Sequence, residues 1–319
     1  MYSLHFYGEM IANAPRVEPY VEALRRSVEP DSVVLDLGCG QGLFALLACR
    51  FGARRVYAIE PDNVINIGRE AALANGCGDR IEFFQSLSTD VTLPEQATII
   101  ISDLRGVLPW FQRHIPSIID ARERLLVPGG VLIPRRDRMY AALVAAPEQY
   151  EEIVGPWRNR LFDVDLSAGL SRITNSWRKT RIRAEELLTE AVCWATLDYQ
   201  TLGSADVDAQ ISWRVARGGI AHGVVVWFDA DLADGITFSN RPGAPELIYG
   251  NGFFPFPRPL EVREGEHTEV RLRADLVEND YVWTWATDFT DQRIEFRQST
   301  FFGVALSPEQ LRKKHAQSS

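Results

Sequence analysis

The segment Val33–Gly42 limits the fold of this chain more than any other part of the sequence. It reads Val-Val-Leu-Asp-Leu-Gly-Cys-Gly-Gln-Gly, and its first five residues form a mostly apolar run of the kind that is buried on both faces of a parallel sheet. Gly38, Gly40 and Gly42 follow at alternate positions, and glycines permit positive φ and let a ligand approach the backbone closely. The segment therefore predicts a buried strand, a ligand-binding loop and the start of a helix.

Strand and helix patterns alternate through the first 134 residues. Predicted strands cover residues 33–37, 56–59, 81–84, 98–101 and 131–133. Predicted helices cover residues 16–27, 43–50 and 63–75, and a further helix ends near residue 126. This alternation is typical of a parallel sheet flanked by helices. We therefore predict a Rossmann-like α/β domain over residues 1–134.

From residue 135 onward, short alternating runs predict a second domain, an antiparallel β-barrel over residues 135–319. The predicted strands cover residues 139–144, 192–197, 210–215, 223–228, 268–272 and 281–286. Residues 148–190 are predicted to be a largely helical insertion, in which the basic residues between Arg172 and Arg183 form a solvated helix face. Phe253, Phe254 and Phe256 are expected to pack the barrel, and Pro308–Ser319 is expected to form a polar helix.

Composition narrows the classes of function. The chain has 319 residues and a net charge of −9, so its surface repels phosphate backbones and we expect no nucleic-acid partner. The four cysteines lack the spacing of zinc or redox motifs. The N-terminal residues do not resemble a secretory signal, and no apolar run approaches the roughly 18 residues of a membrane span. A cytoplasmic protein without membrane partners is therefore expected.

The glycine loop and two acids predict the ligand. Only Gln41 separates Gly40 from Gly42, which is not the spacing that binds a pyrophosphate. Asp36 precedes the loop, and Glu60 ends the second strand, where a carboxylate can accept both hydroxyls of a ribose. A nucleoside that carries an amino acid fits this arrangement, so we predict S-adenosyl-L-methionine (SAM) as the cofactor. NAD is the alternative.

Four further segments have sequences characteristic of one enzyme family. Gly52–Val56 reads Gly-Ala-Arg-Arg-Val before Glu60, and Ile100–Gly106 reads Ile-Ile-Ser-Asp-Leu-Arg-Gly. Ala121–Leu125 matches an Ala-Arg-(charged)-x-(apolar) helix, and Pro128–Pro134 matches a Pro-x-Gly-x-(apolar)-x-Pro turn. In these segments the chain resembles the protein arginine methyltransferase family. The resemblance covers most of the chain.

The resemblance implies roles for individual residues. It places Met10 beside the reactive methyl group and Arg16 on the carboxylate of SAM, although Arg16 could instead be a surface charge on its helix. Glu60 would hold the ribose. Thr89 would lie near the adenine, where the family has an acid, and neighbouring Asp90 could compensate. The resemblance also implies a β-barrel with a helical arm near residues 148–190, and a head-to-tail homodimer.

The resemblance fails at the catalytic residues. The family brackets the substrate guanidinium with two glutamates nine residues apart, because a cation in a dry pocket needs opposite charge. Here the two positions are Asp103 and Gln112. Leu247–Tyr249 takes the place of the family's Thr-His-Trp loop and contains no histidine. The tyrosine-rich leading helix that closes over the cofactor is expected to be mostly absent.

These departures predict a SAM-dependent methyltransferase for an acceptor that is less cationic than arginine, either a small molecule or another protein side chain. Asp103, Gln112 and His114 are the candidate catalytic residues, with Arg105 as an alternative to His114. Each has a simpler interpretation: Asp103 as a helix cap or exposed strand end, His114 as a packing residue, and Arg105 as the partner of a surface acid. Two other functions stay open, a catalytically silent SAM-binding scaffold or sensor, and true arginine methylation.

Overall fold

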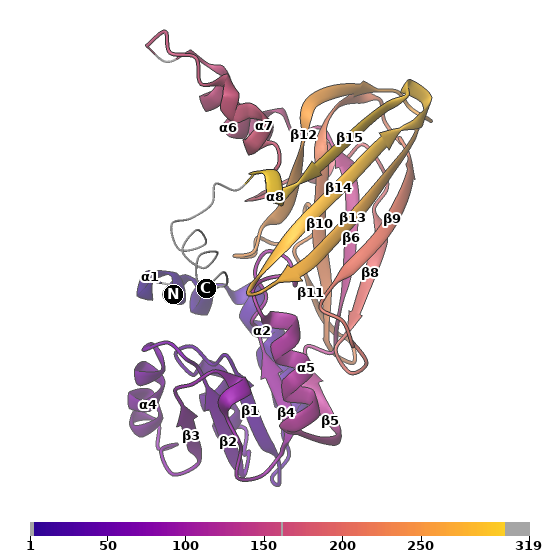
Figure 1. The fold of residues 1–319 in the computed structure, drawn as a ribbon. Coiled ribbons are helices and arrows are strands. Elements are labelled where there is room, and N and C mark those ends of the chain that lie inside the picture. Colours follow the sequence, from indigo (N-terminus) through magenta and orange to yellow (C-terminus); the bar gives the residue numbers. More distant parts are fainter. Residues whose placement is uncertain (1–2, 161, 304–319) are drawn as a thin grey trace, which may run out of the picture.

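The computed structural model describes residues 3–160 and 162–303, which form a parallel unit and an antiparallel unit (Figure 1). The parallel sheet has the strand order β3-β2-β1-β4-β5. Its strands are β1 (Val33–Leu37), β2 (Arg55–Ile59), β3 (Ile81–Phe84), β4 (Ala97–Ser102) and β5 (Leu126–Ile133). The accompanying helices are α1 (Leu4–Ala12), α2 (Ala14–Ser27), α3 (Leu43–Arg50), α4 (Ile65–Ala74), η1 (Ser88–Asp90) and α5 (His114–Arg124). The predicted Rossmann-like fold is confirmed.

Strand β1 positions the site because it lies in the middle of this sheet. All five of its residues are buried, and it pairs in parallel with β2 on one side and β4 on the other. The chain order therefore reverses between β1 and β4, and in open α/β sheets ligands bind at such a reversal, beyond the carboxyl ends of the strands. Gly38, Glu60 and Asp103 follow β1, β2 and β4 at this edge.

The antiparallel unit begins with β6 (Arg136–Val144), directly after the parallel sheet ends at Ile133. It contains two sheets: β7-β12-β10-β6-β8, with β11 paired to β10, and β15-β14-β13-β9. The strands are β7 (Arg178–Thr180), β8 (Val192–Asp198), β9 (Val207–Arg214), β10 (Gly219–Ala233), β11 (Ile236–Ser239), β12 (Asn251–Val262), β13 (His267–Val277), β14 (Asp280–Phe289) and β15 (Ile294–Ser299). Short helices η4 (Thr290–Gln292) and α8 (Thr300–Gly303) flank β15. As predicted, Phe253, Phe254 and Phe256 are fully buried.

The segment between β6 and β8 is helical only in part. It contains α6 (Pro147–Arg158), η2 (Ser167–Gly169), α7 (Leu170–Ile173) and η3 (Ala184–Glu186), and α6 and α7 project from the antiparallel unit (Figure 1). The predicted helix face between Arg172 and Arg183 is wrong, because Arg178–Thr180 is the edge strand β7 and pairs with β12. The predicted helix at Pro308–Ser319 lies outside the described residues. Within residues 3–160 and 162–303, no helix has the length and apolarity needed to cross a membrane.

Candidate functional site

A cavity of about 560 Å³ lies at the carboxyl edge of the parallel sheet, between that sheet, α1 and the loop before β12. It brings together most of the predicted site residues, which come from five separate parts of the chain. Those that line it are Met10, Arg16, Asp36, Gly38, Gly40, Glu60, Asp103 and Gln112. The cavity therefore joins the predicted cofactor loop to the two positions at which the resemblance to the family fails.

The glycine loop forms one end of the cavity. Gly38 and Gly40 have φ of 74° and 53°, in a backbone region that residues with a side chain rarely adopt. The N–H of Gly40 donates to Glu60 Oε2 at 3.1 Å, and the N–H of Asp62 donates to Glu60 Oε1 at 2.9 Å. Burial raises the pKa of Glu60, although these two hydrogen bonds oppose the shift. Each carboxylate oxygen retains a second lone pair, so Glu60 can still accept hydrogen bonds from a ligand.

Asp36 lies near the end of β1 and supports the glycine loop that follows. It is buried, and Ala45 in the first turn of α3 donates its N–H to Asp36 Oδ2 at 2.8 Å. Burial raises the pKa of Asp36 to about 7, although the hydrogen bond from Ala45 opposes this shift. A carboxyl group placed against the N-terminus of a helix satisfies N–H groups that the helix leaves unpaired. Asp36 thus fixes α3 relative to the strand that carries the loop.

Two predicted cofactor residues lie outside the lining of the cavity. A Cβ atom on Gly42 would come within 3.2 Å of the Cα of Gly68 in α4, so this glycine permits close packing of the loop against that helix. Thr89 is exposed on η1, and its hydroxyl contacts Asp90 at 3.4 Å. The assignments of Gly42 and Thr89 to the cofactor pocket are therefore corrected, because Gly42 packs against a helix and Thr89 faces solvent.

The predicted absence of a leading helix is also wrong. Helix α1 contributes Phe6, Tyr7 and Met10 to the cavity wall. Tyr7 is buried, and a Cβ atom on Gly40 would lie 3.0 Å from the Cε1 of its ring. The helix thus covers the glycine loop with an aromatic side chain.

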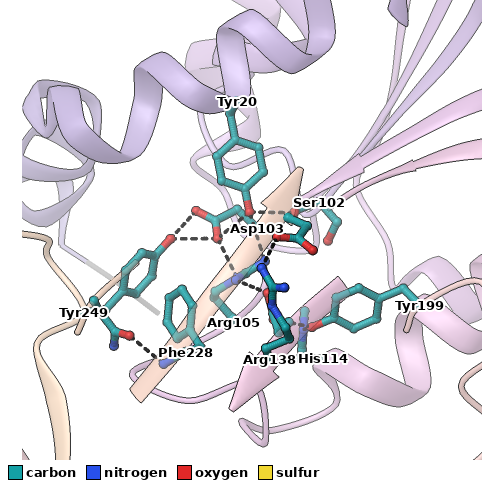
Figure 2. A network of polar contacts seen from close by, with 12 residues as sticks. Tyr20, Ser102, Asp103, Arg105, His114, Arg138, Tyr199, Phe228 and Tyr249 are labelled. Atoms are coloured by element: carbon teal, nitrogen blue, oxygen red, sulfur yellow. Dashed lines mark hydrogen bonds and ion pairs between the residues drawn. The ribbon is translucent and has the colours of Figure 1, made fainter. Parts of the chain in front are cut away.

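Asp103 lies at the centre of a buried polar network (Figure 2). Tyr249 donates its hydroxyl to the carboxylate at 2.6–2.7 Å, and Tyr20 donates at 3.2 Å. Arg16 Nε donates to Asp103 Oδ2 at 2.6 Å, and a second guanidinium nitrogen pairs with the same oxygen. Burial opposes ionisation, but the charges of Arg16 and Arg105 outweigh it and lower the pKa of Asp103. The alternative interpretations, Asp103 as an exposed strand end and Arg16 as a surface charge on its helix, are therefore both wrong.

Arg105 continues this network into the antiparallel unit. Its side chain is fully buried and donates to Asp137 Oδ1 in β6 at 2.7 Å, so it does not pair with a surface acid. Tyr199 donates to the other carboxylate oxygen of Asp137 at 2.6 Å. Two arginines and two aspartates thus neutralise each other inside the molecule, which is the condition for burying charge at tolerable cost.

His114 is a packing residue rather than a catalytic one. It is absent from the cavity wall, and its Nε2 lies 3.1 Å from the hydroxyl of Tyr199. Because that hydroxyl gives its only proton to Asp137, Nε2 must carry the proton of a neutral imidazole. Burial, followed by the charge of Arg105, lowers the pKa of His114 to about 3. The predicted catalytic role of His114 is therefore withdrawn.

A further part of the cavity wall is formed by Gln112, Lys179, Ile248 and Tyr249. Gln112 is exposed in the turn before α5 and has a φ of 46°. The loop that carries Ile248 is held by Asn13, whose side chain donates to Glu246 O at 3.1 Å and accepts from Ile248 N at 3.4 Å. We call these four residues the acceptor end, because they include Gln112 and part of the segment Leu247–Tyr249, the positions at which the resemblance to the family fails.

Sequence reasoning missed Tyr20, Tyr199, Tyr249, Asp137 and Lys179. Tyr20 lies within a predicted helix and Asp137 lies just before the predicted strand 139–144, and nothing in a strand or helix pattern distinguishes a buried polar side chain from an exposed one. Tyr249 was visible as the polar residue in the segment that replaces the Thr-His-Trp loop. Lys179 would have been found if residues 178–180 had been recognised as a strand.

Comparisons with known proteins agree with this geometry. The arginine methyltransferase oligomerization subdomain matches residues 135–291, and the ribosomal protein L11 methyltransferase family matches residues 19–146. Probable protein arginine N-methyltransferase 6 of Arabidopsis thaliana is 29% identical over 82% of this chain and 62% of its own length. Protein arginine N-methyltransferase 2 of Homo sapiens is 27% identical over 88% of this chain and 68% of its own length. The chain thus spans about two thirds or less of these relatives.

Solved structures share the same fold. A chain of the Trypanosoma brucei PRMT1 enzyme-prozyme heterotetrameric complex with AdoHcy superimposes with a TM-score of 0.85 at 22% identity, over 94% of this chain and 98% of that one. Arabidopsis thaliana protein arginine methyltransferase 10 superimposes with a TM-score of 0.80 at 20% identity, over 93% of this chain and 98% of that one. Sequence, fold and site therefore lead to one family: the chain is similar to the protein arginine methyltransferases, with Asp103 and Gln112 in place of the paired glutamates.

Proposed function

We propose that the protein is a SAM-dependent methyltransferase. The observation that carries this proposal is the cavity at the carboxyl edge, where Gly38 and Gly40 leave backbone accessible and Glu60 presents a carboxylate. Glu60 would hold the ribose hydroxyls, and Met10 would lie near the sulfonium. When SAM is bound, it supplies an electrophilic methyl group, and transfer then depends mainly on how the protein positions the acceptor.

The proposed acceptor is less cationic than arginine, and it is a small molecule or another protein side chain. A guanidinium acceptor needs free negative charge to offset its lost hydration. Asp103 already accepts hydrogen bonds from Arg16, Tyr20 and Tyr249. Gln112 is a neutral amide. If Asp103 bound a substrate instead, the buried charge of Arg16 would lose its partner, which would cost a large amount of free energy.

A labelled-methyl assay tests this function. The protein is incubated with SAM labelled in its methyl group and with cell extract, and label is then measured separately in the small-molecule and protein fractions. Binding of S-adenosylhomocysteine is measured alongside by calorimetry. We expect binding together with label outside arginine. Absence of S-adenosylhomocysteine binding would refute the cofactor assignment, and label on arginine side chains would refute the proposed acceptor in favour of true arginine methylation.

A catalytically silent SAM-binding subunit is the second candidate. It is favoured by the saturation of Arg16, whose guanidinium also donates to Met10 O at 3.0 Å and to Tyr249 at 3.0 Å. These contacts leave Arg16 few donors for the carboxylate of SAM. One solved structure with this fold is an enzyme-prozyme complex, so subunits of unequal role occur with this architecture. Cofactor binding without label in any fraction would favour this candidate.

We further propose a cytoplasmic homodimer that forms through the arm containing α6 and α7. The arm exposes large apolar side chains at its tip: Trp157, Phe162, Val164 and Leu166 are between 38% and 89% exposed. Exposed apolar patches of this kind mark interaction surfaces. Light scattering after gel filtration should give twice the 36.0 kDa chain mass, and Phe162→Asp should shift the protein toward the monomer. A wild-type monomer at micromolar concentration would contradict this assembly.

A further inference from the structure

The acceptor end of the cavity holds a cation, the ammonium of Lys179, that no carboxylate contacts directly in the described part of the chain. Within the described residues, the ion pairs of the cavity wall join Arg16 to Asp103 and Arg105 to Asp103 and Asp137, but Lys179 forms none. Its ammonium instead donates to the carbonyl oxygen of Ile248. Glu246, the acid of the loop that carries Ile248, pairs with Arg181. The charges of Glu9 and Glu246 act on Lys179 only from beyond ion-pair distance, so within the described residues the ammonium has no carboxylate in direct contact.

The lysine stem packs closely over a glycine. Gly250 has a φ of 60°, and a Cβ atom there would lie 3.2 Å from Lys179 Cγ and 3.4 Å from Lys179 Cε. The stem thus crosses Gly250 and carries the ammonium to the loop at the cavity wall. Arg178 and Lys179 are adjacent in β7, so their side chains point to opposite faces of the sheet. Of these two residues, only Lys179 lines the cavity.

The acceptor end also lacks a proton acceptor among the described residues. Asp103 is saturated by its hydrogen bonds, and Gln112 is an amide. The hydroxyl of Tyr249 donates to Asp103, and burial, followed by the charge of Asp103, raises the pKa of Tyr249. A neutral amine becomes cationic on methylation and a hydroxyl must lose a proton, so both need help that these side chains do not give. An acceptor that is already an anion needs none.

We propose that the acceptor is a carboxylate and that Lys179 is the residue that selects it. One carboxylate oxygen bonds to the methyl carbon as the carbon–sulfur bond of the sulfonium breaks, the sulfur keeps the electron pair as a neutral thioether, and no proton moves. The product is a neutral methyl ester, which Lys179 holds less tightly than the anion. This inference rests on the proposed methyl transfer and adds the chemical class of the acceptor.

Three probes of matched size test the charge preference directly. Benzoate, benzamide and benzylamine are titrated calorimetrically into the protein saturated with S-adenosylhomocysteine. Benzoate should bind most tightly. Lys179→Met should weaken benzoate about tenfold, in line with the loss of a charge-assisted contact, whereas Lys179→Arg should retain most of the affinity. Arg178→Met is the matched control, since it removes the same charge from the opposite face of β7 and should change nothing.

The outcomes separate this inference from the proposed function. Failure of S-adenosylhomocysteine to bind would count against the cofactor, whatever the probes do. Normal S-adenosylhomocysteine binding with benzylamine equal to or tighter than benzoate would overturn the carboxylate alone, as would an unchanged benzoate affinity in Lys179→Met. A second readout uses the labelled product: a methyl ester releases volatile labelled methanol in alkali, and alkali-stable label would also overturn the carboxylate.

Discussion

Glu60 is the residue whose replacement tests the cofactor pocket most directly. Glu60→Gln keeps the shape of the side chain and one acceptor oxygen, but it removes the charge that strengthens hydrogen bonds to ribose hydroxyls. We expect the affinity for S-adenosylhomocysteine to fall roughly 10- to 100-fold, because hydrogen bonds to charged groups contribute about 1.5–3 kcal/mol. Calorimetry measures the change. Glu82→Gln is the control, since Glu82 pairs with Arg55 away from the cavity and should leave the affinity unaltered.

Asp36 predicts the pH dependence of stability. Its pKa is raised from 3.8 to about 7 by burial, so between these values the folded protein holds a proton that the unfolded chain has released. The free energy of unfolding therefore falls as pH rises through this window and levels off above about pH 7. The loss is up to about 4 kcal/mol at 1.36 kcal/mol per pKa unit.

Asp36→Asn isolates this contribution because asparagine can still accept the N–H of Ala45. Urea unfolding of both proteins at pH 4.5, 6 and 8 gives the comparison. The variant should be more stable than the wild type at pH 8, and the difference should shrink as the pH falls. Parallel curves across this range would show that Asp36 stays ionised in the folded protein.

At the same scale, the sequence predicted residues whose role depends on backbone position and missed those whose role depends on a distant partner. Gly38, Gly40 and Glu60 follow buried strands, and parallel strands bring their carboxyl ends together whatever the rest of the chain does. Asp103 was found in the same way. Its actual partners, Tyr249 and Arg16, come from a loop and a helix, and no pattern within either segment indicates that they meet an aspartate.

At the scale of elements, the packing of the glycine loop against α4 predicts unequal effects of two similar substitutions. Gly42 and Gly76 both have positive φ, of 81° and 66°. A Cβ atom on Gly76 would meet nothing within 4 Å, whereas one on Gly42 would press on the backbone of Gly68. Gly76→Ala should therefore cost about 1 kcal/mol, for backbone strain alone.

Gly42→Ala should cost more than Gly76→Ala, because α4 must move, and it should also weaken S-adenosylhomocysteine binding as the loop shifts. Urea unfolding and calorimetry on both variants give the two quantities. Equal losses of stability together with an unchanged affinity would mean that the contact between Gly42 and Gly68 does not hold the loop in place.

Elements differ in how well their sequences identify them. Strand β1 was predicted with its correct ends because burial on both faces makes all five residues apolar or internally satisfied. Strand β7 was misread as a helix because an edge strand of three residues contains Arg178, Lys179 and Thr180, and charged side chains are common at sheet edges. Its partner, β12, lies more than 70 residues later, so only the tertiary structure reveals the pairing.

At the scale of the whole molecule, one polar network joins the parallel and antiparallel units. Arg105 comes from the turn after β4 and binds Asp137 in β6, and Asp103 binds Tyr249 from the loop before β12. Figure 2 shows how Asp103, Arg105 and Tyr249 converge between the two units. Because each pair is buried, separating the units would expose charges that lack partners. We therefore expect the wild-type protein to unfold in a single transition.

Removing one partner should uncouple the two units. Arg105→Met leaves the carboxylate of Asp137 buried without its cation, and breaking such a pair costs about 3–5 kcal/mol. Every tryptophan except Trp110 lies after residue 134, so fluorescence follows the antiparallel unit, whereas ellipticity at 222 nm follows mainly the helices of the parallel unit. The two signals should share one midpoint in the wild type and separate in Arg105→Met.

Arg122→Met is the control, because it removes hydrogen bonds to the backbone at Tyr199 and Leu202 but no buried ion pair. It should lower stability while the two midpoints stay together. A split in Arg122→Met equal to that in Arg105→Met would show that general destabilisation, rather than the buried charges, separates the units.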